Sequence, residues 1–127
     1  MAAGDVKGEI IAIEVQSGAA VVKGDCVHLE SDGYWDPTDV SDMGSFGIAL
    51  TACDESDNFM CAIWGPVEVD CSGNVPKGAL GVASGLGTIK VQTYASGADA
   101  SNNCVVGKFT EAGTGSSTAT LFVGLVH

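Results

Sequence analysis

Short runs of apolar residues recur along the chain, and each run is bounded by glycine, aspartate, asparagine or serine. No segment holds apolar residues at the i, i+3, i+4, i+7 spacing of an amphipathic helix. Short apolar runs between turn-forming residues are typical of β-strands. The pattern predicts strands over Ile10–Val15, Ala19–Val22, Cys26–Glu30, Tyr34–Trp35, Phe46–Ala52, Phe59–Trp64, Val67–Asp70, Ala79–Ala83, Thr88–Thr93, Cys104–Phe109 and Thr118–Val126.

The clearest predicted hairpin joins Phe46–Ala52 to Phe59–Trp64, because the loop between them, Asp54–Asn58, is entirely polar. Pro66 stands just before the next predicted strand, Val67–Asp70. Proline cannot donate a hydrogen bond to a neighbouring strand, so it is confined to edges, strand starts and bulges. We therefore expect a bend or a sheet edge at this point.

The chain also contains a weak internal repeat. Val22-Lys23-Gly24-Asp25 leads through a hairpin to Gly47-Ile48-Ala49-Leu50, and Pro76-Lys77-Gly78-Ala79 leads in the same way to Gly107-Lys108-Phe109. The expected fold is all-β: a small antiparallel β-barrel or β-sandwich with short strands and Gly-rich turns. We expect one β domain over residues 10–127, preceded by an N-terminal arm or extension over residues 1–9.

Charge removes several classes of partner. The 127 residues carry 16 acids against five lysines and no arginine, for a formal net charge of −11. Such a chain repels phosphate, so neither nucleic acid nor a membrane surface is an expected partner. The window between Gly24 and Pro76 holds all of the excess, with no lysine and eleven acids: Asp25, Glu30, Asp32, Asp36, Asp39, Asp42, Asp54, Glu55, Asp57, Glu68 and Asp70.

Cysteine and carboxylate spacing does not favour a metal site. The five cysteines are widely spaced, with no C-x-x-C and no paired histidine ligands: Cys26, Cys53, Cys61, Cys71 and Cys104. A Cys53–Cys61 bridge across the hairpin is conceivable, but buried reduced thiols are favoured. The two acidic stretches, Asp32–Asp42 and Asp54–Asn58, do not follow the EF-hand pattern of calcium-binding loops. Calcium is therefore considered only as an adventitious or structural ion. We expect no metal and no cofactor.

Catalysis also finds little support. The two histidines are His28, in a predicted strand, and His127, the last residue. The segment Gly44–Gly47 lacks the G-x-S-x-G arrangement of a nucleophile elbow. The stretch before Asp32 resembles part of a biotinyl or lipoyl carrier domain, but the hairpin tip lacks the lysine that such domains modify. We expect a protein that is not an enzyme.

Several segments taken in order are similar to the small capsid decoration, or cement, proteins of tailed bacteriophages, grouped as the DUF2190 type. The resemblance covers roughly Ala19 to Val126 and rests on five segments, which are Val22–Val27, Phe46–Ala52, Gly65–Val69, Val105–Phe109 and Thr120–Val123. It departs from the family pattern where Ala79-Leu80 follows the second Lys-Gly turn, and in its five cysteines.

The resemblance implies a non-enzymatic virion protein. Residues 1–9 contain no apolar segment of the kind found in a secretory signal, so we expect the protein to be made in the host cytoplasm. Such proteins bind the outside of an icosahedral HK97-like capsid, often as homotrimers, and bridge neighbouring capsomers of the major capsid protein. The alternative is an adhesive or carbohydrate-binding β-domain on a phage or bacterial surface, for which Tyr34, Trp35 and Trp64 are the candidate aromatics.

Two sets of residues follow as candidate functional positions. The candidate capsid-contact arm is made of the first residues of the chain, Ala2, Ala3, Gly4, Asp5, Val6 and Lys7. The candidate outward loops are acidic and are expected to face solvent on the virion: Asp32, Asp36, Asp39, Asp42, Asp54, Glu55 and Asp57.

Overall fold

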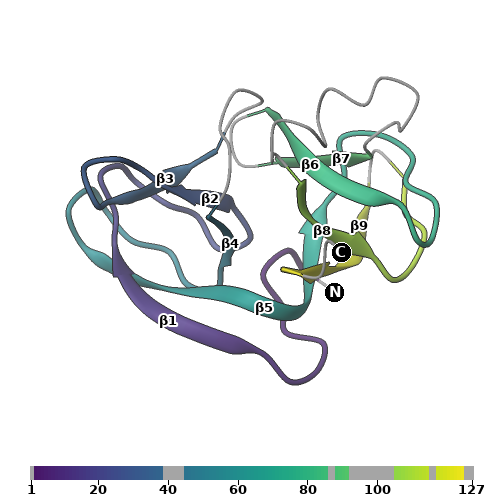
Figure 1. Ribbon diagram of the computed structural model, residues 1–127, viewed down its shortest axis with the longest axis horizontal. Helices are drawn as coiled ribbons and strands as arrows, with labels where there is room; N and C mark the ends of the chain where they lie inside the picture. The colour runs from purple at the N-terminus through teal and green to yellow at the C-terminus, as the bar shows by residue number, and fades with distance from the viewer. Residues whose placement is uncertain (1, 39–44, 86–87, 92–104, 115–116, 125–127) are drawn as a thin grey trace.

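The computed structural model describes residues 2–38, 45–85, 88–91, 105–114 and 117–124 (Figure 1). These residues form an all-β, antiparallel fold, which confirms the predicted fold class. None of them forms a helix of the length and apolarity that crossing a membrane requires. The strands are β1 (Ile11–Gln16), β2 (Cys26–Leu29), β3 (Trp35–Pro37), β4 (Phe46–Ala49), β5 (Asn58–Asp70), β6 (Leu80–Gly85), β7 (Thr88–Val91), β8 (Val105–Phe109) and β9 (Thr118–Val123).

The first half of the chain curls into a nearly closed sheet. Its strands pair in the order β1, β5, β4, β2, β3, all antiparallel. The sheet returns towards its start because Ser17, just after β1, forms a parallel bridge to Trp35 of β3. The Gly18 amide also donates to the Asp36 carboxylate at 2.8 Å. Polar contacts thus fasten the end of the first strand to the last one.

The second half repeats this arrangement. The C-terminal part of β5 pairs with β9, which pairs with β8, then β6, then β7. Here the closing parallel bridge joins Cys71, just after β5, to Ile89 of β7. The Ser72 amide donates to the Ile89 carbonyl at 2.9 Å. Figure 1 shows the two curled halves side by side, with β5 running through both.

The two isolated bridges within the first half each have a counterpart in the second half. Ser17–Trp35 corresponds to Cys71–Ile89, with both residues shifted by 54 positions. Val21 bridges Cys53 as Val75 bridges Gly113, with shifts of 54 and 60. Gly47 and Gly107, at the centres of β4 and β8, also differ by 60. Two copies of one five-strand pattern therefore share this chain.

Strand β5 is longer than the sequence indicates. Phe59–Trp64 and Val67–Asp70 are predicted as two strands, but they form one strand of 13 residues, so that division was wrong. Residues 58–64 pair with β1 and β4, whereas residues 65–70 pair with β9. The change of partners falls at Gly65, whose φ of 112° is accessible mainly to glycine. The N-terminal part of β5 thus belongs to the first-half sheet, and its C-terminal part belongs to the second-half sheet.

The prediction of a strand at Ala19–Val22 was also wrong. Only Val21 makes a bridge there, to Cys53, and Val22 is exposed. The segment is too short for a ladder because the Lys23–Gly24 turn follows immediately, with Gly24 at a φ of 95°. The spacing of Ile11, Ile13 and Val15 predicts that all three lie on one face of their strand. Ile13 and Val15 pack on the core, whereas Ile11 is 53% exposed beside a register shift.

Two groups of buried side chains form the core. The smaller lies inside the first half and includes Phe59, Val27 and Trp35. The larger contains Phe109 and Leu121 of the second half together with residues of the first half, namely Cys26, Ile48 and Ala62. Since the larger cluster draws side chains from both halves, the two curled sheets belong to one hydrophobic unit.

Candidate functional site

The N-terminal segment, residues 2–7, lies along the free edge of the C-terminal part of β5. The Gly4 amide donates to the Glu68 carbonyl at 2.8 Å, and the Glu68 amide donates to the Asp5 carbonyl at 2.9 Å. The Lys7 amide donates to the Pro66 carbonyl at 3.0 Å. The candidate capsid-contact arm is therefore fixed to this domain by main-chain hydrogen bonds and one bridge, Val6 to Val67, and its contact with a capsid stays a prediction.

Side-chain and steric contacts hold this segment in place. The Lys23 ammonium lies 2.7 Å from the Asp5 carboxylate. That hydrogen bond, and a second one from the Ala2 amide, lower the pKa of Asp5 below its ordinary value. Gly4 has a φ of 86°, and a Cβ added to it would lie only 2.8 Å from the Gly24 amide nitrogen, so a larger residue would clash there. Ala3, in turn, lies against Gly24.

The candidate acidic residues fall into three groups. Asp54, Glu55 and Asp57 are exposed on the loop before β5, and Asp32 is exposed at the β2–β3 turn. Asp36 differs because it lies in β3 and accepts the Gly18 amide, so it closes the first sheet instead of lining a loop. Asp39 and Asp42 lie outside the described residues.

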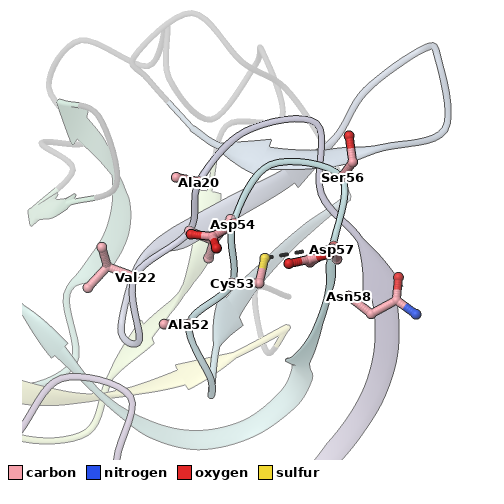
Figure 2. A pocket seen from close by; sticks show the side chains of 9 residues that line it. Ala20, Val22, Ala52, Cys53, Asp54, Ser56, Asp57 and Asn58 are labelled. Atoms are coloured by element: carbon pink, nitrogen blue, oxygen red, sulfur yellow. Dashed lines mark hydrogen bonds between the residues drawn. The ribbon is translucent and has the colours of Figure 1, made fainter.

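A shallow hollow lies beside the acidic loop (Figure 2). Cys53 and Asp54 line it, and both contact the fully buried Ser17, whose Oγ is 3.2 Å from Cys53 Sγ and donates to the Asp54 carbonyl at 3.3 Å. Figure 2 shows the Cys53 sulfur directed towards Asp57, whose carbonyl is 3.8 Å away. These contacts shape the loop. The described part of the chain contains no group of three or more metal-ligating side chains.

The cysteines that the structure describes are free thiols, which rules out the Cys53–Cys61 bridge considered from the sequence. Cys61 faces inward from β5 and is fully buried, whereas Cys53 is half-buried beside the hollow. Burial raises the pKa of the Cys61 thiol to about 12. Cys104 lies outside the described residues.

This difference predicts selective alkylation. The thiolate is the reacting form, and Cys61 forms almost none at pH 8 when its pKa is about 12. In folded protein treated with iodoacetamide at pH 8, we expect Cys53 to react at least tenfold faster than Cys61, as read by peptide mass spectrometry. Alkylation after unfolding in urea is the control, in which the two rates should converge. Equal rates in the folded protein would contradict the burial of Cys61.

An exposed apolar surface was missed by the sequence analysis. It consists of Val6, Ile11 and Trp64, exposed by 44%, 53% and 40%, together with half-buried Phe122, and we call it the apolar flank. Trp64 stacks edge-on against Phe122, with ring centroids 4.8 Å apart. Trp64 lies in β5, and the other three residues pair with it: Ile11 with Trp64, Val6 with Val67, and Phe122 with Pro66. Only the pairing of distant segments brings them together.

The other candidate aromatics do not share this surface. Trp35 is 8% exposed and packs in the first-half core, so it is unavailable as a sugar platform. Tyr34 is exposed at the β2–β3 hairpin. Of the two histidines, His28 packs against Phe46 in neighbouring strands, with ring centroids 5.6 Å apart, and His127 lies outside the described residues.

Among the described residues, Glu68 is the buried carboxylate, at 3% exposure. It accepts hydrogen bonds from the hydroxyls of Thr118 and Thr120 on β9, at 2.7 and 2.8 Å. Thr120 also contacts the Glu111 carboxylate, at 3.0 Å. Because its oxygens are satisfied within the sheet, Glu68 joins β5 to β9 and is not poised to bind a substrate.

The fold resembles a solved phage protein over almost its whole length. The chain matches the crystal structure of the head fiber gp8.5 N base of bacteriophage phi29 with a TM-score of 0.65 and 13% sequence identity. The match covers 94% of this chain and 100% of that one. At this identity the likeness shows a shared fold.

Sequence comparison adds no family. No protein-family model matches the chain, and no curated protein sequence matches it. Membership of the DUF2190 type, which the sequence analysis indicated, is therefore not confirmed.

Proposed function

We propose that this chain is a structural protein of a bacteriophage virion, attached to the outside of the head. The observation that carries the proposal is the likeness to the phi29 head fiber N base, which spans nearly every residue of both chains. The order of segments that resembles capsid decoration proteins supports the same assignment from the sequence. The role proposed is mechanical and not enzymatic.

The distribution of side chains supports an attachment surface at the apolar flank. Exposed Trp64 and Ile11 lie together there, beside the fixed N-terminal segment and its exposed Lys7. Large apolar side chains that cluster on a surface mark sites of protein association. The loop with Asp54, Glu55 and Asp57 is fully polar, and we assign it to the solvent side of the particle.

The finer form of the proposal names the partner and the assembly. In it, the major capsid protein of an icosahedral HK97-like head receives the apolar flank, and three copies of this chain form a homotrimer that bridges neighbouring capsomers. Many modest contacts repeated over a lattice give strong overall attachment through avidity. No cofactor is needed for such a role.

A head-binding measurement tests the proposal. Heads prepared without this chain should bind it in stoichiometric amount during sedimentation, and the bound heads should melt at a higher temperature. Trp64→Ala should weaken binding at least about tenfold, because buried tryptophans at interfaces are frequent hot spots. Tyr34→Ala, also an exposed aromatic, is the matched control and should bind normally.

The alternative surface role gives a different pattern. An adhesive or carbohydrate-binding domain would be retained on a glycan array and would fail to sediment with heads. No binding to heads by the unmodified chain would overturn the proposal, whatever the glycan result.

A further inference from the structure

The outer edge of β1 lacks the main-chain partner that the equivalent strand of the second half has. Shifting by 54 positions converts Ala12 into Pro66 and Glu14 into Glu68, and the shift is the one that relates the closing bridges. The pairing register of the two strands agrees with this shift. Ile13 pairs with Cys61, and Val67, 54 positions after Ile13, pairs with Leu121, 60 positions after Cys61. β1 in the first half and residues 65–70 of β5 in the second half are thus equivalent strands.

The two equivalent edges differ in what covers them. Residues 4–7 occupy the edge at Pro66–Glu68 through three main-chain hydrogen bonds. Among the described residues, none bonds to the outward main-chain groups of Ala12 and Glu14 at the corresponding edge, although the Glu14 carboxylate accepts the Asn58 side-chain amide at 2.8 Å. Figure 1 shows β1 at the margin of the ribbon, with no described strand outside it. The difference appears in burial: Glu68 is buried, whereas Glu14 is exposed.

The main-chain groups of Glu14 point away from β5. Glu14 pairs with Met60, whose amide donates to Thr51 Oγ1 at 3.0 Å and whose carbonyl accepts the Leu50 amide at 2.8 Å. The amide and the carbonyl of Met60 therefore both face the β4 side of β5. Glu14 and Met60 are thus a non-hydrogen-bonded pair of the antiparallel ladder. The Glu14 amide and carbonyl face outward, as those of Glu68 do.

We propose that the edge of β1 at Ala12–Glu14 receives an added antiparallel strand, a basic extended segment of another protein of the phage head. This inference rests on the proposed function. The guest would donate to the carbonyls of Ala12 and Glu14 and accept from the Glu14 amide, copying the bonds that residues 4–7 make in the second half. The edge continues into the apolar flank at Ile11, so one partner would cover both.

Charge selects a basic guest from a different protein. From Gly8 to Val22 the chain carries Glu9 and Glu14 and no lysine, and both glutamates are exposed. A second copy of this chain is a poor donor. Lys7 lies in the N-terminal segment that is already bonded to β5, and Lys23 pairs with Asp5. Lys108 is exposed but lies on β8, which has β6 and β9 on its two sides, and Lys77 lies in a turn. The β7 edge that carries Lys90 is already bridged by Cys71 at Ile89.

The opposing interpretation is that β1 is a guarded edge. Proteins protect exposed edges with charges and bulges, and β1 has Glu14 and a register shift between Ile11 and Ala12. The two interpretations differ in what happens to the Glu14 amide on the particle. A guest strand would protect it from exchange, whereas a guarded edge would leave it open.

Three variants and one exchange measurement separate these interpretations, using the full chain and heads prepared without it. Glu14→Pro removes the outward amide, and proline is tolerated on edge strands. It should weaken head binding about tenfold. Glu14→Gln keeps the amide and removes the charge, so it should bind a few-fold more weakly and with less dependence on salt. Ala12→Pro is the matched control, since Pro66 already stands at the equivalent position, and it should bind normally.

Hydrogen–deuterium exchange of the unmodified protein decides the matter even if Glu14→Pro fails to fold. The segment containing Glu14 should exchange at least tenfold more slowly on heads than free in solution. Unchanged exchange on heads, or normal head binding by folded Glu14→Pro, would overturn the guest strand while leaving the proposed function intact. Protection that appears in free protein as its concentration rises would show a second copy at the edge and would also overturn it. Absence of head binding by the unmodified chain would instead defeat the proposed function.

Discussion

Replacing Phe109 with alanine is expected to destabilise the protein by about 4 kcal/mol, the range measured for large aromatic truncations in cores. Phe109 is 1% exposed and belongs to the core cluster that joins both halves of the molecule. Its ring fills the space above Gly81, where an added Cβ would lie 3.1 Å from the ring edge and 2.9 Å from Leu121. Tight packing on both sides leaves little room for the cavity to collapse. Urea unfolding followed by circular dichroism measures the effect.

Phe122→Ala is the matched control for this change. Phe122 lies on the neighbouring strand but is only half-buried and packs edge-on against exposed Trp64. Its truncation should cost about 1 kcal/mol, the scale of an aromatic pair at a surface. Equal losses in the two variants would contradict the assignment of Phe109 to the core and Phe122 to the flank.

Gly47→Ala is expected to cost about 3 kcal/mol, at the upper end of the usual penalty for overpacking. A Cβ at this position would overlap Cys61 Sγ and lie 2.9 Å from the Ala62 carbonyl oxygen. The backbone oxygen cannot move without breaking the pairing of β4 with β5. The midpoint of urea unfolding should fall accordingly, with the slope unchanged.

Gly73→Ala provides the comparison, because no atom lies within 4 Å of the Cβ it would add. Its stability should stay within about 0.5 kcal/mol of the parent. If Gly47→Ala proved as mild as Gly73→Ala, β4 and β5 would have to lie farther apart than the structure places them.

Local patterns were sufficient to locate most strands. Apolar runs ending at glycine or aspartate give β2, β4, β6, β8 and β9 to within a few residues, since turn chemistry is a property of the chain itself. The Lys-Gly turns at Lys23 and Lys77 identified the repeat for the same reason. The predicted strand ends at Thr93, Cys104 and Val126 lie outside the described residues.

Long-range pairing was not accessible in this way. Pro66 predicts a bend or a sheet edge between two strands, yet β5 continues as one strand because Gly65 adopts a positive φ and residues 65–70 pair with β9. The N-terminal residues are polar and rich in small side chains, so only their main-chain partners on β5 show that they lie along its edge. The apolar flank depends on the same kind of pairing, which joins Val6 to Val67 and Ile11 to Trp64.

The shared strand β5 suggests how this molecule arose. The shifts of 54 and 60 positions are what a duplication leaves behind when one copy then gains six residues between its third and fourth strands. A half-length ancestor would have had to associate with a second chain, and the fraction of associated chains would have depended on their concentration. Splicing the last strand of one copy to the first strand of the next makes that encounter intramolecular. The fused chain would fold as one body even when few copies are present.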